Sequence, residues 1–323
     1  MEKIMSQYST TFHDALAPIV QLFGKCIGGD ARIQPRWEIP EKVAIKVAVV
    51  GTIWDREQNP YQPYTTQETR EEAMACIDAG ACSIHLHVRD EHGNVTHERR
   101  YYREIIDPIR KKYGDRVHFD GESVFGATFE DAMAPIREGL FESSAVNTTA
   151  TYVGDTLVCM PPSFLKAQTT AIQQHNCKAQ IAVYNLGDVD NADRYLIKTG
   201  ILKQPYEWLI VPGLPGCTPM PNPVAMCEGL LPFIYRIREI DPAKNPMIVV
   251  SAGGRASSYL TAFAIMLGLH VRIGMEDTVW RYPHRDELLK NNSQVVADTV
   301  HMARLLGREP ATADEYRTMI GLK

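Results

Sequence analysis

The stretch Cys82-Ser83-Ile84-His85-Leu86-His87-Val88-Arg89-Asp90 determines the fold prediction for the whole chain. Side chains two positions apart on a β-strand point to the same face, so His85 and His87 project together while the apolar residues between and beside them pack behind. A helical pattern over 66–79 precedes this strand and ends in Gly80. A helix, a strand and then a charged loop form one unit of a β/α barrel or an open α/β sheet.

The same alternation of strands and helices continues in both directions from this stretch. We predict strands at 43–50, 82–90, 117–119, 145–147, 179–184, 208–211, 247–250 and 269–273, and helices at 66–79, 99–112, 129–138, 163–174, 190–199, 224–240, 257–267 and 293–306. Strict alternation over this length favours a parallel (β/α)8 TIM barrel over a doubly wound sheet. The barrel is expected to form one catalytic domain over 41–323, preceded by an N-terminal extension over 1–40.

Composition indicates a soluble protein that acts on small molecules. The chain has 323 residues, 45% of them hydrophobic, and a formal net charge of -5 without long basic or acidic runs, which argues against nucleic acid as a partner. No apolar run reaches membrane-spanning length, and residues 1–29 lack the apolar core and cleavage site of a signal peptide. The seven cysteines have no CxxC spacing and are expected to be reduced thiols. These features predict a cytoplasmic location and no membrane partner.

Polar side chains follow the predicted strands at the points where the strands end. In a β/α barrel the active site forms at this carboxyl-terminal face, so we expect these side chains to converge there. The residues concerned are His85, His87, Ser123, Thr148, Asn185, Ser251, Arg272, Glu276 and Asp277.

His85 and His87 are candidate metal ligands. Catalytic zinc commonly takes three protein ligands, nitrogen or carboxylate oxygen, and keeps one position open. Glu276, after the last predicted strand, is the best placed carboxylate to complete the set. Alternatively, both histidines are core residues satisfied by neighbouring groups, and Glu276 pairs with Arg272. Two histidines that face the barrel interior without partners are costly to bury, so the metal site is favoured.

Arg272 and Asp277 are candidate catalytic residues beside that site. A guanidinium fork fits a carboxylate or an enolate, and a carboxylate next to a metal-bound carbonyl is well placed to move a proton from the adjacent carbon. The alternative is an ordinary ion pair in a surface loop, which alone would contribute little.

Two motifs resemble the β-keto acid cleavage enzyme family: His85-Leu-His-Val-Arg-Asp90 and Gly268-Leu-His-Val-Arg-Ile-Gly-Met-Glu-Asp277. The resemblance runs from about Val43 to Leu322. It implies a zinc-dependent (β/α)8 barrel that exchanges groups between a β-keto acid and acetyl-CoA, giving acetoacetate and a new acyl-CoA. It also implies a homotetramer.

The resemblance assigns a role to each matching position of this chain. The implied zinc ligands are His85, His87 and Glu276, and the implied catalytic residues are Arg272 and Asp277. The implied substrate-binding residues, after the third and fourth strands, are Ser123, Gly126 and Thr148.

Two positions depart from the family pattern. Gly51-Thr52-Ile53 has no glutamate two residues past the glycine, where the family's type member carries one, and Tyr184-Asn185 stands where many relatives show an acid. A substrate with a cationic amine would lose its partner, so the sequence does not identify the β-keto acid. Two other functions stay open: a zinc-dependent aldolase or hydrolase that works without CoA, and a catalytically silent barrel that binds an acyl-CoA or keto acid. The intact Arg272, Glu276 and Asp277 argue against the silent barrel.

Overall fold

The computed structural model describes residues 31–124 and 128–323. The chain divides between Ile39 and Pro40 into two units. In the first unit the described residues include one 3-10 turn, η1 (Ala31–Ile33). Across both described ranges, no helix has the length and apolar character needed to cross a membrane.

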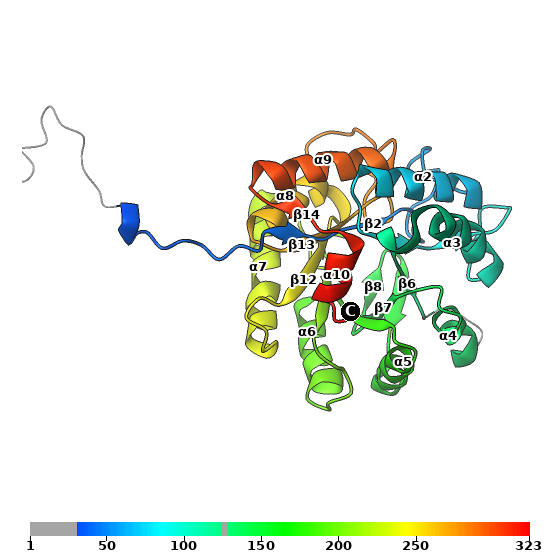
Figure 1. Cartoon of the computed structure of the whole chain (residues 1–323), viewed down its shortest axis with the longest axis horizontal. Coiled ribbons are helices and arrows are strands. Elements are labelled where there is room, and N and C mark those ends of the chain that lie inside the picture. The colour runs from blue at the N-terminus through cyan, green and yellow to red at the C-terminus, as the bar shows by residue number, and fades with distance from the viewer. Residues whose placement is uncertain (1–30, 125–127) are drawn as a thin grey trace, which may run out of the picture. The chain divides into compact units, whose positions relative to one another are not determined.

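Eight parallel strands of the second unit close into a barrel, which confirms the predicted (β/α)8 fold (Figure 1). The barrel closes where β13 pairs with β2, with Val271 opposite Ile45. In chain order the strands are β2 (Ile45–Ala48), β3 (Ser83–Leu86), β6 (His118–Glu122), β7 (Ser143–Asn147), β10 (Lys178–Val183), β11 (Glu207–Ile210), β12 (Met247–Ser251) and β13 (His270–Ile273).

Helices follow the barrel strands in turn and lie around them (Figure 1). Helix α2 shows how the sequence sets their ends: Thr65 and Glu68 form a capping box at its start, and Gly80 adopts a left-handed conformation (φ 114°) at its end. The helices are α2 (Thr66–Ala79), α3 (Arg99–Tyr113), α4 (Phe129–Arg137), α5 (Pro162–Gln174), α6 (Leu186–Ala192), α7 (Pro223–Ile240), α8 (Ser257–Met266), α9 (Asn292–Leu305) and α10 (Ala313–Met319).

The hydrophobic core has two parts because successive side chains of each strand point in opposite directions. Outward-facing residues such as Ile84 and Leu86 pack beneath the helices in one large cluster. Inward-facing small residues such as Ala145 and Ala182 form a second cluster with Tyr316 of α10. Small inward-facing side chains leave room inside the barrel for the polar groups described below.

Three short strand pairs lie outside the barrel. Strand β1 (Lys42–Val43) pairs in parallel with β14 (Glu309–Pro310), β4 (Val88–Arg89) pairs with β5 (Val95–Thr96), and β8 (Ala150–Val153) forms an antiparallel hairpin with β9 (Thr156–Cys159). The predicted strands 43–50 and 82–90 include Val43 of β1 and the whole of β4, but none of the three pairings was predicted. Strands β5, β8, β9 and β14 were missed, since strands of two to four exposed or half-exposed residues give little periodicity.

The helix predicted at 190–199 is wrong in position. Helix α6 begins at Leu186 because the Asp188 carboxylate accepts hydrogen bonds from the backbone N–H groups of Tyr184 (2.8 Å) and Asn185 (2.9 Å). The segment Asp193–Ile197 continues it as a π-helical turn. Asn185 therefore marks a helix start, a local signal that the apolar periodicity did not show.

A cluster of five buried polar side chains, here called the floor layer, lies inside the barrel toward the amino-terminal ends of the strands. It consists of Lys46, Asp120, Gln180, Glu207 and Tyr316. The Lys46 Nζ atom lies 3.0 Å from Asp120 Oδ2 and 3.3 Å from Glu207 Oε1, and Gln180 Nε2 donates to Glu207 Oε1 at 2.5 Å. The Tyr316 hydroxyl, from α10, also donates to Glu207. Helix α10 thus closes this end of the barrel.

Candidate active site

Three ligand atoms converge at the carboxyl ends of β3 and β13. His85 Nε2 lies 3.3 Å from His87 Nε2 and 3.4 Å from Glu276 Oε1, and the distance from His87 Nε2 to Glu276 Oε1 is 3.6 Å. Tetrahedral zinc with bonds of about 2.0–2.1 Å places neighbouring ligand atoms about 3.3–3.4 Å apart. The separations of the three atoms in this chain therefore suit a tetrahedral ion. Glu276 Oε2 is buried and has no hydrogen-bond partner.

Two further carboxylates of β6 adjoin this triangle. His85, His87 and Glu122 offer ligand atoms that all lie within 4.8 Å of one another. On the other side of the ring, His85 Nδ1 lies 3.1 Å from Asp120 Oδ2. A carboxylate on the second nitrogen fixes the orientation of a metal-binding imidazole and raises its basicity. Asp120 therefore joins this site to the floor layer.

The environment of the triangle favours a positive charge. Burial lowers the pKa of His85, but Glu276 and Asp120 outweigh it and raise that pKa to about 10. Burial likewise opposes ionisation of Glu276, yet His85, His87 and Arg272 hold the pKa of its carboxyl well below the ordinary value. Anionic oxygen beside two imidazoles is a donor set that divalent zinc prefers.

Arg272 and Asp277 form a buried ion pair beside the triangle. Arg272 Nε donates to Asp277 Oδ2 at 3.0 Å, and its terminal nitrogen donates to Asp277 Oδ1 at 2.5 Å. The same nitrogen lies 3.3 Å from Glu276 Oε1. Burial raises the pKa of the Asp277 carboxyl despite the opposing charge of Arg272. The alternative of a surface ion pair is wrong, because the side chains of Arg272 and Asp277 are 6% and 1% exposed.

We call His85, His87, Glu122, Arg272, Glu276 and Asp277 together the mouth cluster. A cavity of about 290 Å³ opens above it, and the lining includes His87, Glu122, Arg272, Glu276 and Asp277. Asn147 and Tyr184 also line this cavity, where the Tyr184 hydroxyl donates to Asn147 Oδ1 at 3.1 Å. Three ligand atoms at this spacing, an arginine–aspartate pair and an adjoining cavity are the elements that metal-assisted proton transfer needs.

The side chains of two predicted substrate-binding residues, Ser123 and Thr148, form hydrogen bonds within the protein. Ser123 is buried, and its Oγ atom shares a 2.8 Å hydrogen bond with Ser144 and accepts one from Gln168 Nε2 at 3.2 Å. Thr148 Oγ1 donates to the backbone carbonyl of Asp188 at 2.9 Å. Neither residue is among those that line the cavity. Gly126 lies outside the described residues.

Sequence reasoning missed Glu122 and the β8–β9 hairpin. Glu122 is two positions after Asp120 on β6, so both face the barrel interior while Ser123 faces outward. The period-two rule that selected His85 and His87 would also have selected this pair. Hairpin residues such as Val153, Leu157 and Val158 line the cavity, although no motif marks them.

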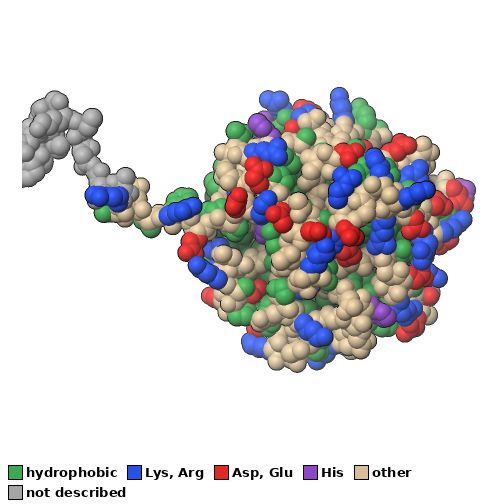
Figure 2. All heavy atoms as spheres, viewed as in Figure 1, with side chains coloured by type: hydrophobic (Ala, Val, Ile, Leu, Met, Phe, Trp, Pro, Cys, Tyr) green, Lys and Arg blue, Asp and Glu red, His purple; other side chains and the backbone are tan. Residues whose placement is uncertain are grey.

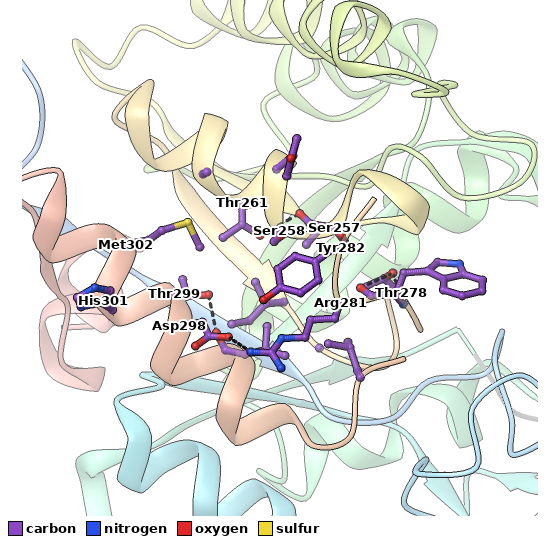
Figure 3. A pocket seen from close by; sticks show the side chains of 18 residues that line it. Ser257, Ser258, Thr261, Thr278, Arg281, Tyr282, Asp298, Thr299, His301 and Met302 are labelled. Atoms are coloured by element: carbon purple, nitrogen blue, oxygen red, sulfur yellow. Dashed lines mark hydrogen bonds and ion pairs between the residues drawn. The ribbon is translucent and has the colours of Figure 1, made fainter. Parts of the chain in front are cut away.

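A larger cavity of about 410 Å³ lies elsewhere, between α8, α9 and the loop after β13 (Figure 3). The Arg281 side chain, which lines this cavity, already forms ion pairs within the protein, at 3.3 Å with Asp298 and at 3.2 Å with Glu287. This cavity contains none of the mouth cluster. Acidic and basic side chains are also interspersed across the face shown in Figure 2, where neither sign forms a continuous patch. The mouth cluster is therefore the candidate active site.

A closed barrel of eight parallel strands with its polar cluster at the strand carboxyl ends defines the class of (β/α)8-barrel enzymes. Within that class, the chain belongs to the β-keto acid cleavage enzyme family, whose sequence model matches residues 42–322. This confirms the resemblance and the prediction that the chain is an enzyme of this family.

Two curated relatives align over most of this chain. The 3-keto-5-aminohexanoate cleavage enzyme of Fusobacterium nucleatum is 31% identical over 285 residues, which cover 88% of this chain and 99% of the relative. The 3-oxoadipate:acetyl-CoA acetyltransferase of Cupriavidus necator is 23% identical over 282 residues, which cover 86% of this chain and 94% of the relative.

A solved structure supports the fold. The apo structure of ObcA superposes with a TM-score of 0.67 at 20% identity, and the match covers 81% of this chain and 66% of the ObcA chain. At this identity the likeness supports the barrel architecture.

Proposed function

We propose that this chain is a zinc-dependent enzyme that converts a β-keto acid and acetyl-CoA into acetoacetate and a new acyl-CoA. The observation that carries the proposal is the triangle of His85, His87 and Glu276 next to the buried Arg272–Asp277 pair. Family membership supports β-keto acid cleavage, and the name of the Cupriavidus necator relative includes acetyl-CoA.

His85, His87 and Glu276 are the proposed zinc ligands, because their ligand atoms have the mutual separations that tetrahedral zinc requires. Glu122 lies close enough to act as a further ligand or as a hydrogen-bond acceptor for substrate. When bound, zinc would act as a Lewis acid that makes the carbon between the keto and carboxylate groups more acidic. Asp120 would keep the His85 ring oriented by accepting a hydrogen bond from its Nδ1–H group.

In the proposed reaction Asp277 acts as the base. Its carboxylate removes a proton from C2 of the keto acid, and its raised pKa brings it closer to the pKa range in which a carboxyl group is an effective base at neutral pH. Arg272 holds Asp277 in position and stabilises the negative charge that develops on the substrate. Removal of one preorganised hydrogen-bond donor from an oxyanion site typically costs about 2.7–4 kcal/mol.

The carbon–carbon exchange then needs no further redox partner. The C2 carbanion attacks the acetyl carbonyl and expels CoA thiolate, which attacks the original keto carbon. The C2–C3 bond breaks, leaving the original acyl group on CoA and an acetoacetate carbanion. Asp277 returns its proton to that carbanion, so the residue ends the cycle as it began.

The substrate-binding roles of Ser123, Gly126 and Thr148 remain proposals. The side chains of Ser123 and Thr148 bond to the protein itself, so their proposed contribution is to fix the wall beside Glu122 and Asn147, which line the cavity. The homotetramer and the cytoplasmic location also remain predictions from the sequence.

The test is product formation from both substrates by the zinc-loaded protein. Incubation with a β-keto acid and isotopically labelled acetyl-CoA should give labelled acetoacetate and the new acyl-CoA in equal amounts. Cleavage of the keto acid at the same rate without acetyl-CoA would contradict the proposal and support an aldolase or hydrolase. Binding of either substrate without turnover would support the silent barrel.

A further inference from the structure

We infer that the β-keto acid taken by this chain carries a short, uncharged aliphatic group next to its keto carbon, and that an apolar wall selects this group. The inference rests on the proposed function, because it specifies the substrate of the same cavity. The apolar wall consists of Ile53, Val124, Val153, Leu157, Val158, Met160, Val211 and Leu214, all of which line the cavity above the mouth cluster.

The charged groups of the cavity lie at its reacting end. Among the described lining residues, the Lys, Arg, Asp and Glu side chains are Glu122, Arg272, Glu276 and Asp277. Each belongs to the mouth cluster: Arg272 binds Asp277 and Glu276, and Glu122 lies within 4.8 Å of the two histidines. A charged group at the far end of a substrate would therefore lose water and find no opposite charge beside it. That loss is unfavourable for a carboxylate and for an ammonium.

The hairpin contributes an exposed apolar surface to the wall. Leu157 is 60% exposed although it lines the cavity, so it offers apolar area that a ligand can cover. Burial of apolar area against an aliphatic chain is favourable in proportion to the area removed from water. An aliphatic substituent is the chemistry that matches this side chain and the Ile53 and Leu214 side chains.

The wall is formed before substrate arrives, because the hairpin is bonded to the loop after β11. The Gly154 N–H donates to the Pro215 carbonyl at 2.9 Å, and Thr151 Oγ1 donates to the Gly216 carbonyl at 3.0 Å. Gly216 has φ +84°, and a Cβ atom there would lie 2.2 Å from the Tyr152 carbonyl oxygen. The close approach requires glycine and holds the hairpin over the cavity. A preformed wall discriminates by fit rather than by rearrangement.

The size of the cavity limits the chain length. A volume of about 290 Å³ is near the lower end of the range typical for ligand pockets, about 300–1,000 Å³. The cavity must admit the keto acid and the acetyl end of acetyl-CoA together. The substituent is accordingly a few carbons long.

The test compares three 3-oxo acids of equal chain length that end in a methyl group, a carboxylate or an ammonium group. Two readouts are needed on the zinc-loaded protein: kcat/KM for acetoacetate formation with acetyl-CoA, and Kd by calorimetry without it. We expect the methyl acid to have a kcat/KM about tenfold or more above, and a Kd about tenfold or more below, the values of both charged acids. A charged acid whose Kd equals or falls below that of the methyl acid overturns the inference.

A variant pair checks the wall itself. Leu157→Glu places a carboxylate in the apolar wall, and the exposure of Leu157 means that the fold should tolerate it. Leu305→Glu is the matched control, because Leu305 is 73% exposed on α9 and does not line the cavity. Leu157→Glu should lower the ratio of the Kd of the ammonium acid to the Kd of the methyl acid by about tenfold. The control should leave the ratio unchanged, and an equal ratio in both variants overturns the role of the wall.

The two readouts separate failure of the inference from failure of the proposed function. Tighter binding of the methyl acid without turnover of any acid would support the wall and contradict the proposed reaction. Turnover with preference for a charged acid would support the reaction and overturn the wall. Absence of binding by all three acids would also overturn the wall.

Discussion

The two ends of the barrel contain similar charged residues but differ in how those charges are neutralised. In the floor layer, Lys46 lies between Asp120 and Glu207, and helix α10 seals the layer with Tyr316. Asp120 and Glu207 raise the pKa of Lys46 against the effect of burial, so the floor layer keeps its own cation. In the mouth cluster one arginine faces three carboxylates, which gives a formal charge of −2 when both histidines are neutral, as they must be to bind a metal, and a cavity adjoins the cluster.

This difference separates a structural role from a catalytic one. The Lys46 ammonium group offsets negative charge in the floor layer, so that layer needs no bound ion. The mouth cluster, in contrast, has the charge and donor atoms that suit a divalent ion. Substitutions in the floor layer should therefore change stability, and substitutions in the mouth cluster should change metal content and turnover. Asp120 of the floor layer links the two, because it contacts Lys46 and also His85 of the mouth cluster.

The largest effect is expected from His87→Ala. Loss of a direct ligand should lower zinc content and abolish turnover, a greater effect than the roughly 10–100-fold typical for residues that only contact a ligand. Metal analysis and the acetoacetate assay measure both quantities. His92→Ala is the control, because His92 is exposed in the loop after β4. A His87→Ala protein that keeps one zinc per chain would remove His87 from the ligand set.

Asp277→Asn should separate catalysis from metal binding. The amide cannot accept the C2 proton, so kcat should fall by about 10²–10⁴-fold, while zinc content stays the same. Turnover by stopped assay and metal analysis of the same preparation provide the comparison. Near-normal rates would assign the base to another residue.

Asp120→Asn should affect both ends of the barrel. The variant weakens the contact to His85 Nδ1, so zinc affinity should fall by about 10–100-fold. It also removes a negative charge from Lys46, which should lower the free energy of unfolding. Competition with a chromogenic chelator gives the affinity, and urea titration gives the stability. A change in only one of the two quantities would show that Asp120 does not couple the floor layer to the mouth cluster.

The smallest expected effect on activity is that of Tyr316→Phe. The variant loses the hydrogen bond from α10 to Glu207, and the free energy of unfolding should fall by about 1–3 kcal/mol. Zinc content and kcat should stay at wild-type values, because Tyr316 lies in the floor layer. Reduced zinc content in the folded variant would contradict the separation between the two ends.

The fold was predictable because the pattern that sets it is local. Barrel strands such as β12 carry a short apolar run, and a helix such as α2 shows its start at Thr65 and its end at Gly80 in the sequence. The β8–β9 hairpin was not predictable, because its strands have four residues each and every position in them is half-exposed or exposed. Its position depends on contacts with the loop after β11 that no local pattern shows.

The candidate site was predictable where side chains share a strand. His85 on β3 and His87 directly after it are close because alternate residues of an extended chain face the same way. Arg272 and Asp277 are close because they flank one turn. Glu122 was missed because Ser123 was selected from the same strand end, one position out of phase. The apolar wall draws residues from several separate loops and the hairpin, so only the three-dimensional structure assembles it.

The most direct test of the distinction between the two ends is a zinc titration of metal-free protein, with acetoacetate formation recorded at each step. We predict that the rate rises in proportion to zinc and saturates at one equivalent per chain. In the Asp277→Asn protein zinc should bind with the same stoichiometry and restore little activity. A rate that is independent of zinc, or full activity before zinc is added, would contradict the assignment of the mouth cluster as a metal-dependent catalytic site.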